Sequence, residues 1–364
     1  MKIRRPRLSV VNRLGLASLA IAAALAGFQT VANAEPQAAT CPGHPDAIGT
    51  SRTLVVDPTV HRKIGTMSYP ETLPLADHEV VLTFDDGPLA PYTNRILDIL
   101  DAECVKATYF IVGTMAKSSP KLLQQVAERG HTIGTHSMGH PIKFRRLSAE
   151  AGIAQLDDGI AATAAALGDA GKLAPFFRFP GFGSTEAVET RAAAEGIMIW
   201  GADMPADDWR RISAKEVAKR AISRIEAKGK GVLLLHDIHQ RTVEALPLIL
   251  KELKERGYRI VHVVPSSAER PATPTVASDW KMRPEREAKQ HVATLPKNVM
   301  TDVSGSSPDK AKDKSANSGA SKKSRRHGRH FGKSERHRVA HGHHQNRHQA
   351  FRDSRTPWDR QASR

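Results

Sequence analysis

The chain has 364 residues, of which 54 are Lys or Arg and 38 are Asp or Glu, so its formal net charge is +16. An apolar content of 40% is sufficient for a folded core and excludes a wholly disordered chain. With only two cysteines, the sequence excludes a disulfide-based scaffold and a four-cysteine zinc module.

The basic excess lies at the two ends of the chain. Residues 1–34 carry five basic and no acidic side chains, and residues 266–364 carry 22 basic and 10 acidic ones. Residues 35–265 are nearly neutral, with 27 basic and 28 acidic side chains. Because a nucleic-acid-binding domain spreads positive charge over its folded surface, this distribution predicts no nucleic-acid partner.

The N-terminal residues 1–34 have the pattern of an export signal. A basic start precedes an apolar run from Leu14 to Phe28, and the small residues Ala32-Asn33-Ala34 follow as a cleavage pattern. The run is shorter than the roughly 20 residues that span a bilayer. We therefore expect cleavage after Ala34, no transmembrane anchor afterwards, and a periplasmic or secreted protein.

Export would place the two cysteines, Cys41 and Cys104, in an oxidising compartment. The sequence leaves open whether they form a disulfide or remain two thiols.

Residues 266–364 change in composition to Pro, Ser, Lys, Arg and His, and the apolar periodicity ends. Such a segment buries too little apolar surface to offset its conformational entropy, so we predict a disordered, basic, His-rich tail. One interpretation is a solvated tail without a partner, and a second is electrostatic attachment to an anionic envelope polymer. A third is loose metal capture by the histidines of residues 341–348.

The middle of the chain, residues 78–265, alternates short apolar runs with longer amphipathic ones, and residues 35–77 precede it as a lead-in segment. The predicted strands are 80–84, 107–112, 132–135, 175–178, 198–201, 231–235 and 259–263. The predicted helices are 93–102, 121–129, 149–167, 186–195, 214–227 and 243–256. This alternation predicts parallel βα units, and seven strands favour a small α/β barrel over a doubly wound sheet.

Candidate site residues, most of them ionisable, follow five of the predicted strands, where a barrel places its catalytic groups. They are Asp85 and Asp86; His136 and His140; Arg178, Gly181 and Phe182; Asp203, Asp207, Asp208 and Trp209; and His236 and His239. Each group alone is an ordinary turn or ion pair, but their convergence on one rim favours a site.

The residue types fit metal-assisted hydrolysis of an amide or ester. His136 and His140 are spaced so that both imidazoles can reach one ion, and one carboxylate would complete three protein ligands. A second carboxylate held by Arg178 could accept a proton, and His236 on another strand could donate one to the leaving group. Spacing alone does not separate the roles of Asp85 and Asp86.

The same residues resemble the five ordered motifs of the polysaccharide deacetylases, the nodulation-protein-B-like carbohydrate esterases that include chitooligosaccharide deacetylases. The motifs are Thr83-Phe-Asp-Asp-Gly-Pro88, His136 with His140, Arg178-x-Pro180, Asp208-Trp209 and Leu234-Leu-His236. The resemblance implies a distorted seven-stranded (β/α) barrel for residues 78–265. It also implies an acetylated polysaccharide or oligosaccharide as substrate and a divalent metal, with Zn²⁺ expected before Co²⁺ or another ion.

Carried over by position, the resemblance makes Asp85 the general base, held by Arg178. It makes His236 the general acid, tuned by an aspartate. The implied metal ligands are Asp86, His136 and His140, and the implied substrate-binding residues are Gly181, Phe182 and Trp209.

Two motifs depart from the family pattern. Gly181 and Phe182 are transposed relative to the usual aromatic-Gly order, which leaves the oxyanion donor open. Asp203, Asp207 and Asp208 all remain candidates for the partner of His236, with Asp208 preferred. His239 is additional, and we place it on the rim.

The sequence therefore predicts an exported, metal-dependent hydrolase that removes acetyl groups from an N-acetylated glycan of the chitooligosaccharide or peptidoglycan type. An O-acetyl polysaccharide esterase with the same residues is one alternative. Another is a non-catalytic envelope-binding protein attached through its basic tail.

Overall fold

The computed structural model describes residues 41–282, so the predicted signal segment and most of the predicted tail lie outside the described residues. The strands are β1 Thr50–Val56, β2 Lys63–Ile64, β3 Glu79–Asp85, β4 Thr108–Ile111, β5 Thr132–Thr135, β6 Leu173–Phe177, β7 Met198–Trp200, β8 Met204–Pro205, β9 Gly231–His236 and β10 Arg259–Pro265. The α-helices are α1 Tyr92–Ala102, α2 Gly113–Ser118, α3 Pro120–Glu128, α4 Ala149–Leu167, α5 Glu186–Ala194, α6 Ala214–Lys228 and α7 Gln240–Glu255.

The fold is a mixed α/β arrangement around one parallel sheet of ten strands. The order is β1-β10-β3-β4-β5-β6-β7-β2, and β9 pairs with both β3 and β8. The seven predicted strands and six predicted helices are all present, with ends shifted by a few residues. Although β7 and β8 follow each other in the chain, they share no ladder within residues 41–282.

Strand β3 occupies the centre of this sheet because its side chains are apolar enough to be buried on both faces. All seven of its residues are buried, as expected for a parallel strand that is covered on both sides. It pairs along most of its length with β9 and, at its carboxyl end, with β4. The residues that follow β3 therefore lie between the ends of two neighbouring strands.

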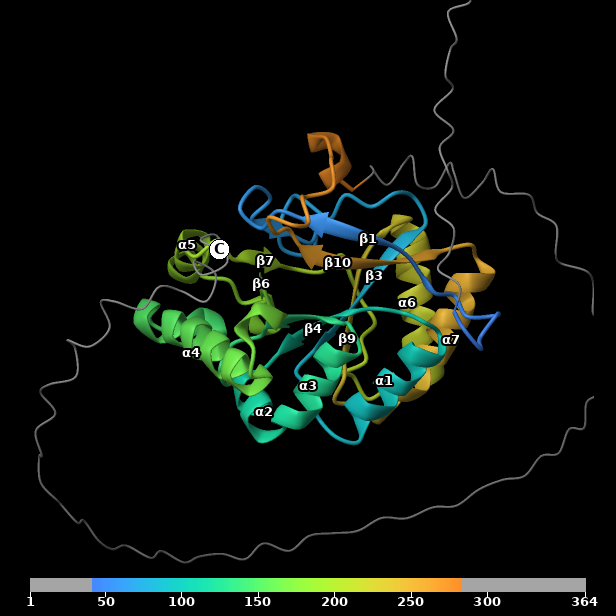
Figure 1. Cartoon of the computed structure of the whole chain (residues 1–364), viewed down its shortest axis with the longest axis horizontal. Coiled ribbons are helices and arrows are strands. Elements are labelled where there is room, and N and C mark those ends of the chain that lie inside the picture. The colour runs from blue at the N-terminus through green and yellow to red at the C-terminus, as the bar shows by residue number, and fades with distance from the viewer. Residues whose placement is uncertain (1–40, 283–364) are drawn as a thin grey trace, which may run out of the picture. The chain divides into compact units, whose positions relative to one another are not determined.

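The helices cover the outside of the sheet, with α6, α7, α1, α3, α4 and α5 each packing against the next (Figure 1). Apolar residues of these helices join those of the strands in a large core, for example Leu97, Leu123 and Leu246. None of the helices in residues 41–282 combines the length and the apolar content that would let it cross a bilayer.

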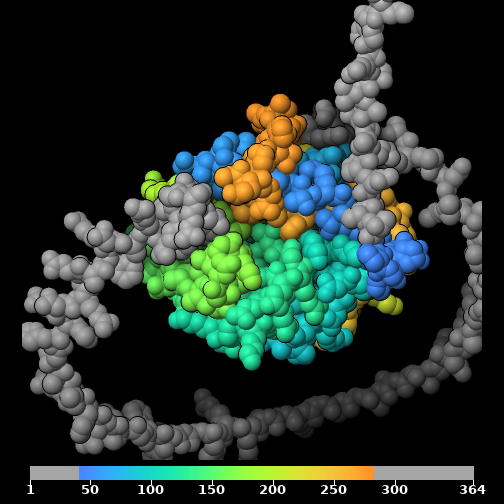
Figure 2. Space-filling view, viewed as in Figure 1, coloured from blue at the N-terminus to red at the C-terminus, as the bar shows by residue number. Residues whose placement is uncertain are grey.

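The folded part extends beyond the predicted 78–265 boundaries on both sides. Residues predicted as a lead-in contribute β1, which pairs with β10, and β2, which pairs with β7. On the C-terminal side, the prediction of a disordered tail is wrong for residues 266–282, which pack against residues 55–72 (Figure 2). Trp280 is buried there, stacks on His61 at 3.6 Å between ring centroids, and belongs to the same apolar cluster as Leu73.

Cys41 and Cys104 form a disulfide with 5.7 Å between their Cα atoms. The bond links the start of the described chain to the end of α1. Backbone hydrogen bonds from Gly49 to Glu103 and from Thr50 to Cys104 continue this attachment. The question that the sequence left open is therefore answered in favour of pairing.

Candidate active site

The turn that follows β3 carries two adjacent aspartates that point to different partners. Asp85 is the last residue of β3 and is buried, whereas Asp86 leaves the strand with a positive φ of 80°. Gly87 comes next, and a Cβ atom there would lie 2.0 Å from Asp237 Oδ2, so only glycine fits. This change of backbone direction points the two carboxylates to different partners, a difference that their spacing in the sequence did not predict.

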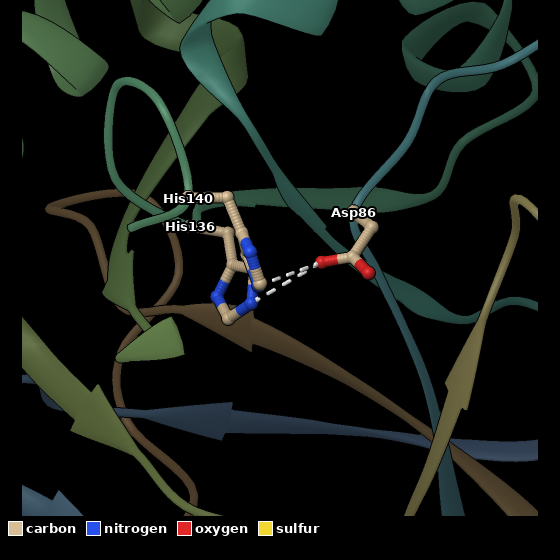
Figure 3. A group of neighbouring side chains, drawn as sticks. All are labelled: Asp86, His136 and His140. Carbon is tan, nitrogen blue, oxygen red and sulfur yellow. Dashed lines mark ion pairs between the residues drawn. The ribbon is translucent and has the colours of Figure 1, made fainter. Parts of the chain in front are cut away.

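Asp86, His136 and His140 face one another, with one ligand atom from each lying within 4.8 Å of the others (Figure 3). Asp86 Oδ1 is 3.2 Å from His140 Nε2 and 3.5 Å from His136 Nε2. Ligands bound to one zinc ion at about 2.0–2.1 Å would be about 3.3 Å apart in a tetrahedral arrangement. Asp86 Oδ1 is buried and has no hydrogen-bond partner among the described residues. The donor types, their spacing and this unsatisfied oxygen all fit a divalent ion.

The orientation of His136 is set by its other ring nitrogen. Nδ1 lies 2.7 Å from the carbonyl oxygen of Arg178, and as the donor in this contact it leaves the Nε2 lone pair facing Asp86. Burial lowers the pKa of His136 and outweighs the opposing charges of Asp85 and Asp86. His136 is therefore neutral at physiological pH, the state in which an imidazole binds a metal.

The second carboxylate of the turn, Asp85, is held by a fully buried arginine. Arg178 Nη1 donates to Asp85 Oδ1 at 2.7 Å and to Thr83 Oγ1 at 2.8 Å, and Nη2 donates to the Gly201 carbonyl at 2.8 Å. The guanidinium also stacks 4.1 Å from the centre of the Phe110 ring. These contacts fix the arginine, and through it they fix the free oxygen of Asp85 near the triad.

His236 at the end of β9 is paired with Asp208. Its Nδ1 lies 2.8 Å from Asp208 Oδ1, and its backbone N–H donates to Asp208 Oδ2 at 2.7 Å. Thr242 Oγ1 also donates to that oxygen at 2.7 Å. Burial lowers the pKa of His236, but the hydrogen bond and charge of Asp208 outweigh it and raise the pKa to about 9.

The other two candidate aspartates are engaged elsewhere. Asp203 accepts from the backbone N–H groups of Thr66 and Val232 and from the hydroxyls of Thr66 and Thr72. Asp207 accepts from Arg220 at 2.7 Å and from Arg224 at 2.9 Å. Of the three aspartates, Asp208 is thus the one that contacts His236.

The expected substrate-binding residues lie in the segments that follow β6 and β8. Gly181 and Phe182 lie in a short 3-10 turn after β6, both with φ of 55°, and the Phe182 carbonyl accepts from Arg145 at 3.4 Å. Trp209 is 43% exposed and meets His236 edge to face at 5.5 Å between centroids. The His239 ring lies 6.1 Å from the His236 ring, which agrees with a rim position.

Asp237 is a residue of this region that the sequence reasoning did not select. It is fully buried, its Oδ2 accepts from Thr93 Oγ1 at 2.6 Å, and its Oδ1 has no hydrogen-bond partner among the described residues. Burial raises its pKa to about 7. Because Asp237 lies against Gly87, it supports the turn that carries Asp85 and Asp86. The sequence feature that could have identified Asp237 is its position directly after His236 at the end of β9.

Comparison with known sequences agrees with this arrangement. The sequence profile described as polysaccharide deacetylase matches residues 73–200. A peptidoglycan-N-acetylglucosamine deacetylase of Bacillus cereus is 32% identical over 189 residues, which cover 50% of this chain and 85% of the relative. A chitooligosaccharide deacetylase of a Bradyrhizobium strain is 28% identical over 201 residues, covering 51% and 89% respectively.

Among solved structures, the Bdellovibrio bacteriovorus peptidoglycan deacetylase Bd3279 is similar with a TM-score of 0.54 and 30% identity, over 60% of each chain. The match spans 66% of a second Bacillus cereus peptidoglycan-N-acetylglucosamine deacetylase and 38% of the Listeria monocytogenes enzyme PgdA, so these relatives are matched only in part. The shared region contains the turn after β3, both histidines of the triad and Arg178. The chain belongs to the polysaccharide deacetylase family.

Proposed function

We propose that this protein is a metal-dependent hydrolase that removes acetyl groups from an N-acetylated glycan. The observation that carries the proposal is the grouping of three elements at one end of the sheet. They are the Asp86–His136–His140 triad, the Asp85–Arg178 pair and the Asp208–His236 pair. The names of the relatives support the same class of activity.

Asp86, His136 and His140 would hold one divalent ion, with zinc preferred because one carboxylate and two imidazoles are typical ligands of catalytic zinc. Such an ion would supply a Lewis acid for the acetyl carbonyl and would lower the pKa of a water molecule. His140 is the more open ligand, since its side chain is 32% exposed whereas that of His136 is 3% exposed. Substrate would therefore approach from the His140 side.

Asp85 would act as the general base. Its Oδ2 lies 3.7 Å from His136 Nε2, beside the triad, while Arg178 engages Oδ1. In this position Oδ2 can accept the proton of the attacking water as its oxygen bonds to the acetyl carbon. The buried guanidinium of Arg178 donates to Oδ1 and so prevents the Asp85 carboxylate from rotating away.

His236 would act as the general acid. As the C–N bond breaks, a protonated His236 gives its Nε2 proton to the leaving amine, and acetate is the other product. Asp208 keeps this imidazole protonated and correctly turned, because it accepts at Nδ1. We assign Gly181 as the backbone donor to the oxyanion, and Phe182 and Trp209 as the walls that contact the sugar.

The experiment is acetate release from N-acetylglucosamine oligomers and from an O-acetylated polysaccharide, each with added zinc and with a chelator. Release from the N-acetyl substrate that is lost with chelator and restored by zinc supports the proposal. Release from the O-acetylated substrate alone would assign an esterase instead. No release from either substrate by zinc-loaded protein would favour a non-catalytic envelope-binding role.

The wider organisation remains part of the proposal. We propose that residues 1–34 direct export and are removed, and that the residues after Met282 attach the enzyme to an anionic envelope polymer through their charge. We also propose that the strands form the distorted (β/α) barrel of the family. The parallel order from β7 through β3 to β9 supports this arrangement.

A further inference from the structure

Basic side chains, most of which form no ion pair within residues 41–282, collect on two sides of the candidate site. On one side, Lys143, Arg145 and Arg146 follow β5 and are exposed; we call them the Phe182 flank because Arg145 Nη2 donates to the Phe182 carbonyl. On the other side are Arg210, Arg211 and Arg241, which we call the Trp209 flank.

The Trp209 flank is tied directly to the catalytic pair. Arg241 Nη1 donates to the backbone carbonyl of Asp208 at 3.1 Å and also to that of Arg210. Arg210 and Arg211 follow Trp209 in the chain, and both are exposed. The flank therefore lies next to Trp209, whose ring contacts His236.

These arginines differ from most others in the described part of the chain. Arg129, Arg191 and Arg256, for example, each pair with two carboxylates. Arg145, Arg146, Arg211 and Arg241 form no ion pair within residues 41–282, and Arg210 is 3.9 Å from Asp207, whose carboxylate already accepts from two other arginines. The exposed Glu150 and Glu186, at the starts of α4 and α5, pair with none of them.

The sheet places the flanks apart, with the reacting groups between them. In the strand order β6-β5-β4-β3-β9-β8, the Phe182 flank follows β5 and contacts the turn after β6, and the Trp209 flank follows β8 and β9. Asp85 ends β3 and Asp86 follows it, and β3 lies in the middle of this order. A polymer that crosses the site would thus meet cationic groups before and after the acetylated sugar.

We propose that the two flanks bind carboxylate groups carried by the glycan on either side of the acetylated sugar, so that the preferred substrate is an anionic acetylated glycan. Planar guanidinium groups are well suited to this because they can bind a carboxylate through two parallel hydrogen bonds. Residues 35–265 are nearly neutral as a whole, so the positive charge of the flanks is local to the site and does not make the entire folded surface cationic. The inference rests on the proposed deacetylase function.

The test compares carboxymethylated chitin oligomers with the same oligomers after their carboxylates have been converted to amides, which keeps the size and removes the charge. With zinc-loaded full-length protein at low ionic strength, we expect kcat/KM to be about tenfold higher on the charged oligomer. Added salt should reduce this ratio, because exposed charges are screened.

Two double variants, Arg145→Gln/Arg146→Gln and Arg210→Gln/Arg211→Gln, should each lower the ratio through a higher KM on the charged oligomer, with kcat nearly unchanged. Activity on the amidated oligomer reports whether each variant remains folded. The control is Lys172→Gln/Lys251→Gln, which removes two exposed charges from the amino end of β6 and from α7 and should preserve the ratio.

Equal turnover of the two oligomers by the unmodified protein would overturn this inference while leaving the deacetylase proposal intact. A ratio that persists in both double variants would also overturn it. If the variants instead lost binding to anionic lipid vesicles with unchanged hydrolysis, the flanks would belong to a membrane surface. Failure to release acetate from either oligomer would count against the proposed function itself.

Discussion

His236 Nδ1 lies 2.8 Å from Asp208 Oδ1, and the backbone N–H of His236 donates to the other oxygen of the same carboxylate at 2.7 Å. One aspartate therefore fixes both the ring and the main chain of the histidine at the end of β9. Because Asp208 is fully buried, its charge is poorly screened and acts strongly on the imidazole.

Replacing Asp208 should change the titration of His236. The pKa of His236 is raised to about 9 against burial, which lowers it, so Asp208→Asn should reduce the pKa by more than one unit. NMR titration of the chelator-treated protein measures this directly, with His239→Ala as a control on the same rim. An unchanged His236 pKa in Asp208→Asn would contradict the assignment of its partner.

The same shift has a consequence for stability. A pKa that is higher in the folded than in the unfolded state stabilises the fold below the ordinary value of 6.5, and the effect is lost as the pH rises through about 9. Urea unfolding of the chelator-treated protein should therefore show a fall in unfolding free energy over this range. Asp208→Asn should show a smaller fall.

Asp86→Asn should separate metal binding from folding. Asparagine tolerates the positive φ at this position, and Asp86 Oδ1 has no hydrogen-bond partner to lose among the described residues, so the metal-free protein should keep its stability. Zinc affinity, measured by calorimetry, should fall by at least about 100-fold. Loss of a residue that only hydrogen-bonds to a metal ligand already lowers metal affinity by up to about 100-fold, and loss of a ligand should lower it further. Equal zinc affinity in the variant and the parent would exclude Asp86 as a ligand.

Breaking the buried Asp85–Arg178 pair from one side should be more harmful than removing both charges. Arg178→Met leaves the Asp85 carboxylate buried without its cation, at a cost of about 3–5 kcal/mol in unfolding free energy. The double variant Asp85→Asn/Arg178→Met should recover part of that stability and remain inactive. If the double variant were as unstable as the single one, the pair would not be coupled in this way.

The disulfide should stabilise the protein without contributing to catalysis. Its sequence separation of 63 residues corresponds to about 4 kcal/mol in the chain-entropy description. Urea unfolding of Cys41→Ser/Cys104→Ser should show a loss of this order, while acetate release under native conditions stays near the parent value. A stability equal to that of the oxidised parent would refute the expectation.

Much of the sheet could be predicted from the sequence because its central strands are continuous apolar runs. The strand β1 was missed because its residues are mostly half-buried and give a weak pattern. The two-residue strands β2 and β8 are defined by their pairing with β7 and β9, and such long-range pairing leaves no pattern in the local sequence. The polar composition of residues 266–282 predicts a tail, but Trp280 is buried and the segment forms backbone hydrogen bonds with Val55, Val56 and Thr72.

The family resemblance predicts most of the candidate site, including the contact of Arg178 with Asp85, but it does not predict Asp237. The residues after β3, β5 and β9 were selected because they follow strands, and the structure brings Asp86, His136 and His140 together. The sequence keeps Asp203, Asp207 and Asp208 as candidates with Asp208 preferred, and only the contacts that each makes with residues distant in the chain assign Asp208 to His236. Such long-range contacts depend on the packed fold and leave no spacing in the sequence.

In the proposed mechanism, hydrolysis depends on an ion held by the Asp86–His136–His140 triad. The most direct measurement is a zinc titration of chelator-treated protein while acetate release from N-acetylglucosamine oligomers is followed. We expect no acetate release without zinc, a rise to a plateau at about one equivalent, and no comparable rise for Asp86→Asn at the same zinc concentrations. Full release in the presence of chelator, or an unchanged titration in Asp86→Asn, would contradict it.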